Sequence, residues 1–214
     1  MIKYIFFVLI SILVSDAALA QTEIAVPPFH DRFCELVRKL EAGDTGINYR
    51  EFRESFIESQ QFLIAYGKKT IFDSLKNAMY EAMHKKTYQD VVTITKEMLS
   101  IDYTSMLAHK ILRQTYNILG DTVNRNKYHG IQFGLLKSIV NNGDGKTCAT
   151  GWPVIQISEE YFILDMLDAK LTRQSIDNNG GFCDKMEVTT DEGEKTYYFE
   201  ISDIVKGNNK LGMH

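Results

Sequence analysis

Apolar side chains in the first part of the chain recur with helical spacing. Within residues 29–40 they stand three and four positions apart, which places them on one face of a helix. Asn48 followed by Glu51 has the spacing of a capping box, with Asn in the place of the usual Ser or Thr. These residues predict a second helix over residues 49–66, which Gly67 closes.

The middle of the chain carries a pattern that occurs twice. Residues 77–102 and 108–138 share a similar succession of apolar and small residues, and each predicts helix, short turn, helix, with Ser105 as the N-cap before the second pair. This resembles a tetratricopeptide repeat, whose unit is about 34 residues long. No proline follows the first copy, and Val123 and Asn126 stand where a strict repeat has small residues. A plain pair of helical hairpins is the alternative.

Alternating apolar and polar positions replace the helical period in the last third of the chain. Residues 152–158 predict a strand, and Ser158 then caps a short helix. Residues 171–176 predict a further strand. The last two β-rich runs, residues 185–190 and 195–202, flank a loop that contains glycine and therefore predict a β-hairpin.

Helices first and strands afterwards predict an α+β fold. We expect antiparallel, tetratricopeptide-like helical hairpins over residues 21–140. A small antiparallel sheet with one short helix, formed by residues 141–214, would pack on these helices.

The N-terminus predicts export. Lys3 precedes an apolar run over residues 4–14, and small residues end at Ala18-Leu19-Ala20, as in a secretory signal peptide that is cleaved after Ala20. The run is shorter than the roughly 20 residues that span a bilayer, although a retained membrane anchor is the alternative. We expect residues 1–20 to be removed and the protein to be periplasmic or extracellular, without a membrane span in the mature chain.

Net charge argues against a polyanionic partner. The chain carries a formal charge of −4 at pH 7, and no basic patch of the kind that nucleic-acid binders present is visible. We therefore expect no nucleic acid.

The stretch Gly143-Asp144-Gly145-Lys146-Thr147 resembles the end of a phosphate-binding loop. A P-loop needs a first glycine at position 140, where the chain has Val140. The stretch also follows a predicted helix and precedes a predicted strand, which is the reverse of the P-loop context. We expect no nucleotide and no other cofactor, and interpret Gly143 and Gly145 as turn residues that permit positive φ.

Three cysteines remain after cleavage of the signal peptide, Cys34, Cys148 and Cys183. In an oxidising compartment two cysteines can pair. Cys148 and Cys183 both lie at loop edges of the predicted β region, so we expect a disulfide between them, with three separate thiols as the alternative. Cys34 lies among apolar residues and is expected to be a buried thiol.

The sequence carries no motif of a metal or catalytic site. None of the five histidines has metal-ligand spacing from another histidine or a cysteine. The nucleophile-elbow pattern Gly-x-Ser-x-Gly is absent. Glu159 and Glu160 begin a predicted helix, where the helix dipole favours negative charge, so their structural role explains them. We assign no metal ligand and no catalytic residue.

Short motifs along most of the chain resemble a family of exported bacterial proteins with a domain of unknown function. These motifs are Gly43-Asp44, Ile47-Asn48-Tyr49-Arg50-Glu51-Phe52, Ala65-Tyr66-Gly67, Leu119-Gly120-Asp121, Gly143-Asp144-Gly145-Lys146-Thr147, Val154-Ile155, Glu159-Glu160-Tyr161, Cys183-Asp184 and Tyr197-Tyr198-Phe199-Glu200-Ile201-Ser202. The resemblance implies no established activity and no catalytic residue.

Stacked helix pairs expose a concave face that suits a peptide or protein segment. The expected function is therefore non-catalytic binding of a protein or peptide partner, and the aromatic candidates for contact are Tyr80, Tyr88, Tyr116 and Tyr128. Two alternatives come from other classes. The first is an extracytoplasmic inhibitor or immunity-type protein directed against a secreted enzyme. The second is a hydrolase, which requires Asp184, Glu159 or Glu160 to meet a histidine in a cleft.

Overall fold

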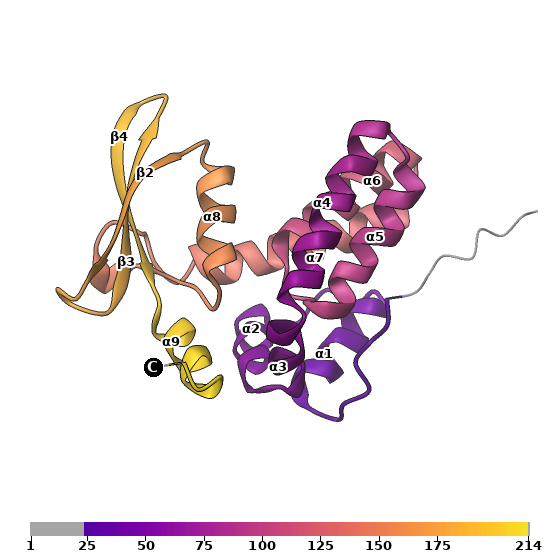
Figure 1. Ribbon diagram of the computed structural model, residues 1–214, viewed down its shortest axis with the longest axis horizontal. Coiled ribbons are helices and arrows are strands. Elements are labelled where there is room, and N and C mark those ends of the chain that lie inside the picture. The colour runs from indigo at the N-terminus through magenta and orange to yellow at the C-terminus, as the bar shows by residue number, and fades with distance from the viewer. Residues whose placement is uncertain (1–23, 214) are drawn as a thin grey trace, which may run out of the picture.

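The computed structural model describes residues 24–213 and shows an α+β fold (Figure 1). Helices occupy most of the first part of the chain, and the four strands of the sheet all follow residue 150. The expected fold class is confirmed. The signal peptide that the sequence predicts over residues 1–20 lies outside the described residues. Among residues 24–213, none of the helices combines the length and the apolar character that crossing a membrane requires.

Three short helices form one corner of the molecule, α1 (Arg32–Glu41), α2 (Tyr49–Glu58) and α3 (Gln60–Gly67). Asn48 caps α2 as expected, because its side chain accepts from the backbone N–H groups of Arg50 and Glu51. The single helix predicted over residues 49–66 is wrong, since the chain breaks at Ser59. Ser59 adopts an extended conformation with ψ 163°, and its hydroxyl caps α3 by accepting from the backbone N–H of Phe62.

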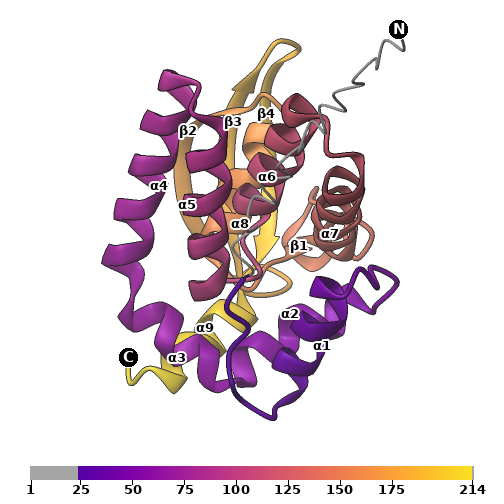
Figure 2. The ribbon, with the colours of Figure 1, turned by 90° about the vertical axis from the view of Figure 1, so that its right-hand side faces the viewer.

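Four longer helices form an arm that stands beside the sheet (Figures 1 and 2). They are α4 (Lys69–Lys85), α5 (Tyr88–Ile101), α6 (Met106–Leu119) and α7 (Thr122–Val140). Short turns make consecutive helices of the arm antiparallel. Ser105 caps α6 as predicted, accepting from the backbone N–H of Ala108. Met79, Val91, Met98 and Ile111 pack between α4, α5 and α6.

The sheet contains four strands in the order β1-β4-β3-β2. These are β1 (Trp152–Pro153), β2 (Lys170–Asp177), β3 (Cys183–Thr190) and β4 (Gly193–Glu200). The hairpin predicted near the C-terminus is confirmed as β3 and β4, and the strand predicted over residues 171–176 as β2. The sheet is mixed rather than antiparallel throughout, because β1 pairs in parallel with β4.

The strand expected over residues 152–158 is wrong beyond Pro153. The backbone N–H of Ile155 donates to Glu159 Oε2 at 2.8 Å, so this side chain takes the place of a neighbouring strand. Helix α8 (Ile157–Met166) begins two residues later, with Gln156 as its N-cap, so the cap expected at Ser158 is wrong. Val154 and Ile155 are buried in the core, which explains why their apolar character resembled that of a strand.

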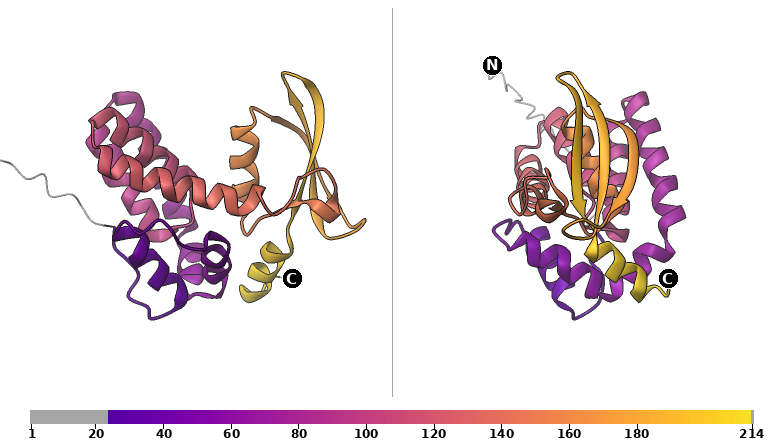
Figure 3. Two further views of the ribbon diagram at one scale, coloured as in Figure 1. Left: turned by 180° about the vertical axis from the view of Figure 1, so that it is seen from behind. Right: turned by 90° about the vertical axis from the view of Figure 1, so that its left-hand side faces the viewer.

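Helices cover one face of the sheet, while its other face is turned outward (Figure 3). Helix α8 lies between the sheet and the helical arm (Figure 1). Helix α9 (Ser202–Lys210) follows β4 and returns to the corner formed by α1 to α3. There Lys210 Nζ donates to the backbone carbonyl of Ile57 at 2.8 Å. The C-terminal helix thus fastens the sheet side of the molecule to α2.

One hydrophobic core joins the helices to the sheet. It runs from Phe33 and Phe52, whose rings stack with centroids 5.1 Å apart, through α7 to Met186 and Phe199 of the sheet. Helix α7 has a glycine where Tyr49 crosses it, and a Cβ at this Gly134 would lie 2.1 Å from the Tyr49 ring. The close contact between α2 and α7 therefore requires glycine at position 134, which has no side chain.

Cys148 and Cys183 form the disulfide that the sequence predicts, with a Cα–Cα distance of 5.6 Å. It joins the short 3-10 helix η1 (Cys148–Thr150) to the start of β3. Closure of a loop of 35 residues contributes about 4 kcal/mol in the chain-entropy account of disulfides. Cys34 is a buried free thiol, and burial raises its pKa to about 12, so it stays protonated.

The loop that resembles a P-loop is a tight turn beneath Trp152. Gly145 has a positive φ of 65°, as expected for a turn glycine. Gly143 does not have a positive φ, and its role differs from the expected one: a Cβ there would lie 2.5 Å from the carbonyl oxygen of Gly151. The indole N–H of Trp152 donates to the carbonyl of Gly143 at 3.1 Å and closes the turn.

A buried ion pair connects the helices to the sheet region. Arg53 of α2 and Glu159 of α8 form a two-pronged contact, with Nε to Oε1 at 2.8 Å and Nη2 to Oε2 at 2.6 Å. The side chains of both are only 3% exposed. Arg53 Nη2 also donates to the carbonyl of Pro153 at 2.9 Å. This pair therefore fixes α2, β1 and α8 relative to one another.

We predict that Arg53→Met or Glu159→Gln lowers the free energy of unfolding by about 3–5 kcal/mol, because each change leaves one buried group without its charged partner. Urea denaturation followed by circular dichroism measures this. Arg50→Met is the matched control, since Arg50 forms an exposed ion pair with Glu54 on the same helix; its loss is expected to cost less than about 1 kcal/mol. An Arg53 variant as stable as the Arg50 variant would contradict the prediction.

Candidate binding site

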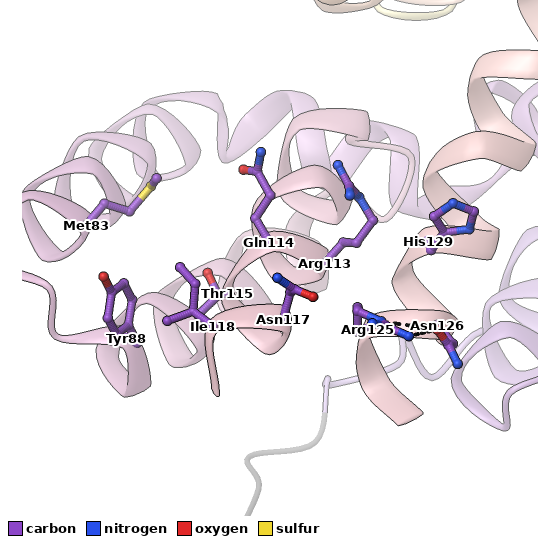
Figure 4. A pocket seen from close by; sticks show the side chains of 10 residues that line it. All are labelled: Met83, Tyr88, Arg113, Gln114, Thr115, Asn117, Ile118, Arg125, Asn126 and His129. Atoms are coloured by element: carbon purple, nitrogen blue, oxygen red, sulfur yellow. Dashed lines mark hydrogen bonds between the residues drawn. The ribbon is translucent and has the colours of Figure 1, made fainter. Parts of the chain in front are cut away.

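A hollow of about 700 Å³ on the helical arm lies along α6. We call it the α6 groove. Its lining comes from the α4–α5 turn with Met83 and Tyr88, from α6 with Arg113, Gln114, Thr115, Asn117 and Ile118, and from α7 with Arg125, Asn126 and His129 (Figure 4). Cavities of this size hold small ligands or a few side chains of a partner.

The amphipathic pattern of α6 produces the groove. This helix turns Ile111, Leu112 and Thr115 into the core. Gln114 and Asn117 therefore face outward, because positions three and four residues apart share one face of a helix. Buried side chains of α4, α5 and α6 pack against one another beneath them.

The two ends of the groove differ in character (Figure 4). Met83 and Tyr88 form one end, and Ile118 lies next to them, so this end is apolar. Arg125 and His129 of α7 form the other end, which is basic. The side chains of α6 lie between the two ends.

The arginines of the groove are held by neutral partners. Arg113 Nε donates to Gln132 Oε1 at 2.7 Å, and its guanidinium lies 5.9 Å from the centre of the Phe133 ring. Arg125 donates from Nη2 to Asn126 Oδ1 at 2.9 Å. No salt bridge within residues 24–213 involves either arginine. None of the ten lining residues is acidic. The groove therefore carries net positive charge.

A second hollow of about 510 Å³ lies on the opposite side of Asn126, which lines both. Its charged residues are Glu41 and Lys127, which pair with each other at 2.9 Å. The Tyr103 hydroxyl also donates to Glu41. This hollow is therefore electrically balanced, unlike the α6 groove.

The four tyrosines singled out in the sequence have different positions. Tyr88 lines the α6 groove, and Tyr80 on α4 is 41% exposed. Tyr116 and Tyr128 are buried, with stacked rings whose centroids are 5.7 Å apart. Burial raises the pKa of Tyr116 to about 12. In this structure, contact with a partner is therefore open to Tyr80 and Tyr88, whereas Tyr116 and Tyr128 are part of the core.

Sequence reasoning missed the basic residues of the groove. Arg113 and Gln114, then Asn117 and Ile118, follow the spacing of one outward helix face. That spacing was the available signal. It did not show that α7 brings Arg125 next to the same face, because this proximity depends on the angle between the two helices.

The carboxylates considered for hydrolysis, on α8 and on strand β3, are all buried. Glu159 is engaged by Arg53, as described above. Glu160 is fully buried, and neither of its oxygens finds a hydrogen-bond partner among the described residues. Asp184 on β3 is 6% exposed and accepts from Gln174 Nε2 at 2.7 Å. Burial, and then the nearby charge of Asp184, raise the pKa of Glu160 to about 8, so at pH 7 this side chain is mostly neutral.

His109 is also part of the core. Its Nε2 donates to the carbonyl of Tyr103 at 2.8 Å, and its ring lies 5.8 Å from that of Tyr128. Burial lowers the pKa of His109 to about 4. The ring is therefore neutral at physiological pH and enclosed by aromatic neighbours. Residues 24–213 contain no cluster of three or more histidine, cysteine or acidic side chains suited to a metal ion.

We predict that Glu160→Gln stabilises the protein increasingly as the pH rises from about 5 to about 8. In the unfolded chain Glu160 ionises near its ordinary pKa of 4.5, but in the folded protein only near 8. Over this interval the unfolded state releases the proton first, so the wild type loses stability by up to about 1.4 kcal/mol per pH unit from this group. Glutamine is neutral in both states and removes that loss.

Urea denaturation at pH 5, 6, 7 and 8 measures the effect, with Glu97→Gln as the control because Glu97 is exposed on α5. Parallel stability profiles for the wild type and Glu160→Gln across this range would show that Glu160 is not protonated in the folded protein.

Comparison with known proteins identifies a family but no characterised relative. A search of curated proteins gave no significant match. A search of solved structures gave none either. The family described as "Domain of unknown function (DUF4919)" matches residues 29–210, which include every helix and strand described above. The chain belongs to this family of domains of unknown function.

Proposed function

We propose that this protein is an exported, non-catalytic binding protein that holds a peptide segment of a partner in the α6 groove. The observation that carries the proposal is the groove itself, an open hollow of about 700 Å³ on a packed helical arm. It combines an accessible aromatic ring, Tyr88, with side chains that donate and accept hydrogen bonds. Such a combination is typical of sites that bind by shape and a few polar contacts.

The form of the arm supports the proposal. Helices α4 to α7 make two consecutive helical hairpins, and the pattern of residues 77–138 resembles tetratricopeptide repeats. Stacked helix pairs of this kind bind partners on an extended surface while the scaffold stays fixed. Tyr80 and Tyr88 are the aromatic residues on α4 and α5 that remain accessible for such contact.

The disulfide supports export. Disulfides persist in oxidising compartments and are rare in the cytosol, and Cys148 and Cys183 are paired here. The signal peptide expected at residues 1–20 gives the route, and the place of action is then periplasmic or extracellular.

The surroundings of the acidic residues favour binding over hydrolysis. A general acid or base needs to come within hydrogen-bond reach of its substrate. Glu159 is bound to Arg53, and Glu160 and Asp184 are enclosed between α8 and the sheet. In the α6 groove, His129 has no acidic residue beside it in the lining.

We predict that Tyr88→Ala/Ile118→Ser abolishes capture of the partner, because the change removes the apolar end of the groove without touching the core. The immobilised mature protein is incubated with the extracytoplasmic fraction, and bound proteins are quantified by mass spectrometry. Tyr66→Ala/Ile71→Ser is the matched control, since Tyr66 and Ile71 are exposed and do not line the groove.

A partner lost at least tenfold with the groove variant and retained by the control supports the proposal. A partner that the groove variant retains would place the binding surface elsewhere and contradict it. If the retained partner were a secreted enzyme whose activity the protein blocks, the inhibitor alternative would hold instead.

A further inference from the structure

We propose that the occupant of the α6 groove is an extended acidic peptide segment, with an apolar side chain at the α4–α5 end and a carboxylate at the α7 end. This inference rests on the proposed function and names the chemistry of the partner. It follows from the uneven distribution of charge and apolar surface along the groove (Figure 4).

Arg113 of α6, which lies next to the basic end, offers further hydrogen-bond donors to the groove. Gln132, which is buried, holds the Nε of Arg113. The terminal nitrogens of Arg113 donate to no hydrogen-bond acceptor within residues 24–213. Contact with Phe133 orients the plane of the guanidinium. An arginine that is positioned in this way binds a carboxylate with two parallel hydrogen bonds and loses little side-chain entropy.

No acidic residue lines this end of the groove. The acidic residue closest in sequence to Arg125 is Asp121, whose side chain caps α7 by accepting from the backbone N–H of Asn124 at 3.0 Å. In the neighbouring hollow the cation Lys127 is already paired with Glu41. The chain as a whole carries a charge of −4, so the positive charge of the groove is a local feature.

Exposed apolar side chains also lie near the turn between α6 and α7, and one of them, Ile118, lines the groove. Ile118 is 57% exposed, and Val123 just beyond the turn is 78% exposed. Leu119 between them is exposed as well. Apolar side chains gathered at one exposed turn mark a contact surface more often than isolated ones do. Within the groove itself, Ile118, Met83 and Tyr88 give an apolar residue of the segment a place to pack.

The middle of the groove suits a polypeptide backbone. Gln114 and Asn117 carry amide groups, which both donate and accept hydrogen bonds. A peptide presents both kinds of group along its length, whereas a nucleic acid requires a longer series of cations to neutralise its phosphates. With two arginines and an apolar end, the groove fits an acidic peptide better than a polynucleotide.

A library of random dodecapeptides displayed on phage provides the test, because it does not presuppose the partner. The library is panned on the mature protein, and enriched sequences are compared for charge. We expect enrichment of sequences with one or more Asp or Glu and an apolar residue several positions away. Affinity of a selected synthetic peptide is then measured by fluorescence polarisation at 50 and 500 mM salt, and is expected to fall at the higher concentration because salt screens exposed charges.

The double variant Arg113→Gln/Arg125→Gln is expected to lower the affinity for the selected peptide at least about tenfold, since it removes both charged donors. Arg125→Gln alone leaves the Arg113–Gln132 contact intact, so it tests the charge without disturbing the core; a loss of about threefold or more is expected. Lys68→Gln/Lys137→Gln is the control, because it changes the net charge equally at exposed positions outside the groove. Its affinity is expected to stay within about twofold of the wild type.

The outcomes separate the two proposals. Enriched peptides that are neutral or basic, yet lose binding in Tyr88→Ala/Ile118→Ser, would overturn the acidic segment and leave the groove as a peptide site. Enrichment that is independent of Tyr88, Ile118 and both arginines, or no enrichment at all, would overturn the proposed function as well. A single-stranded oligonucleotide that displaces the selected peptide and binds more tightly would show that the charge serves a different polyanion.

Discussion

The contact between Arg53 and Glu159 is the constraint on which the arrangement of the molecule depends. Charges buried away from water cost several kcal/mol each unless their partners are well placed. Here the arginine also meets the Pro153 carbonyl, and the glutamate accepts the backbone N–H of Ile155. These additional contacts end β1 after two residues and start α8. One ion pair thus sets where the strand stops, where the helix begins and how both lie against α2.

This constraint explains why one side of the helical arm stays open. Helix α8 lies against the arm, where Lys110 of α6 pairs with Asp165 of α8 at 2.8 Å. The buried side of the arm is therefore occupied by α8 and the core. The outward positions of α6 have no such neighbour within the described residues, and they line the groove. The proposed binding surface therefore results from the way the sheet region is anchored.

The sequence was informative for several features that depend on nearby residues. The caps at Asn48 and Ser105 and the hairpin of β3 and β4 are local patterns of this kind. The pairing of Cys148 with Cys183 was predictable because both lie at loop edges of one small region. Features that depend on distant contacts were missed. Ser59 breaks a continuous apolar pattern because α3 turns toward α9, and Tyr116 and Tyr128 are buried because α6 and α7 face each other.

The central claim is that the helices and the sheet form one body, joined by the shared core and the buried ion pair. The single tryptophan, Trp152, stacks on Tyr197 with ring centroids 5.4 Å apart and reports on the sheet, whereas far-ultraviolet circular dichroism reports mainly on the helices. The direct test is urea denaturation followed by both signals on one sample. Coincident curves with one midpoint are predicted. Separate midpoints, with the tryptophan signal changing while the helices remain folded, would contradict the account.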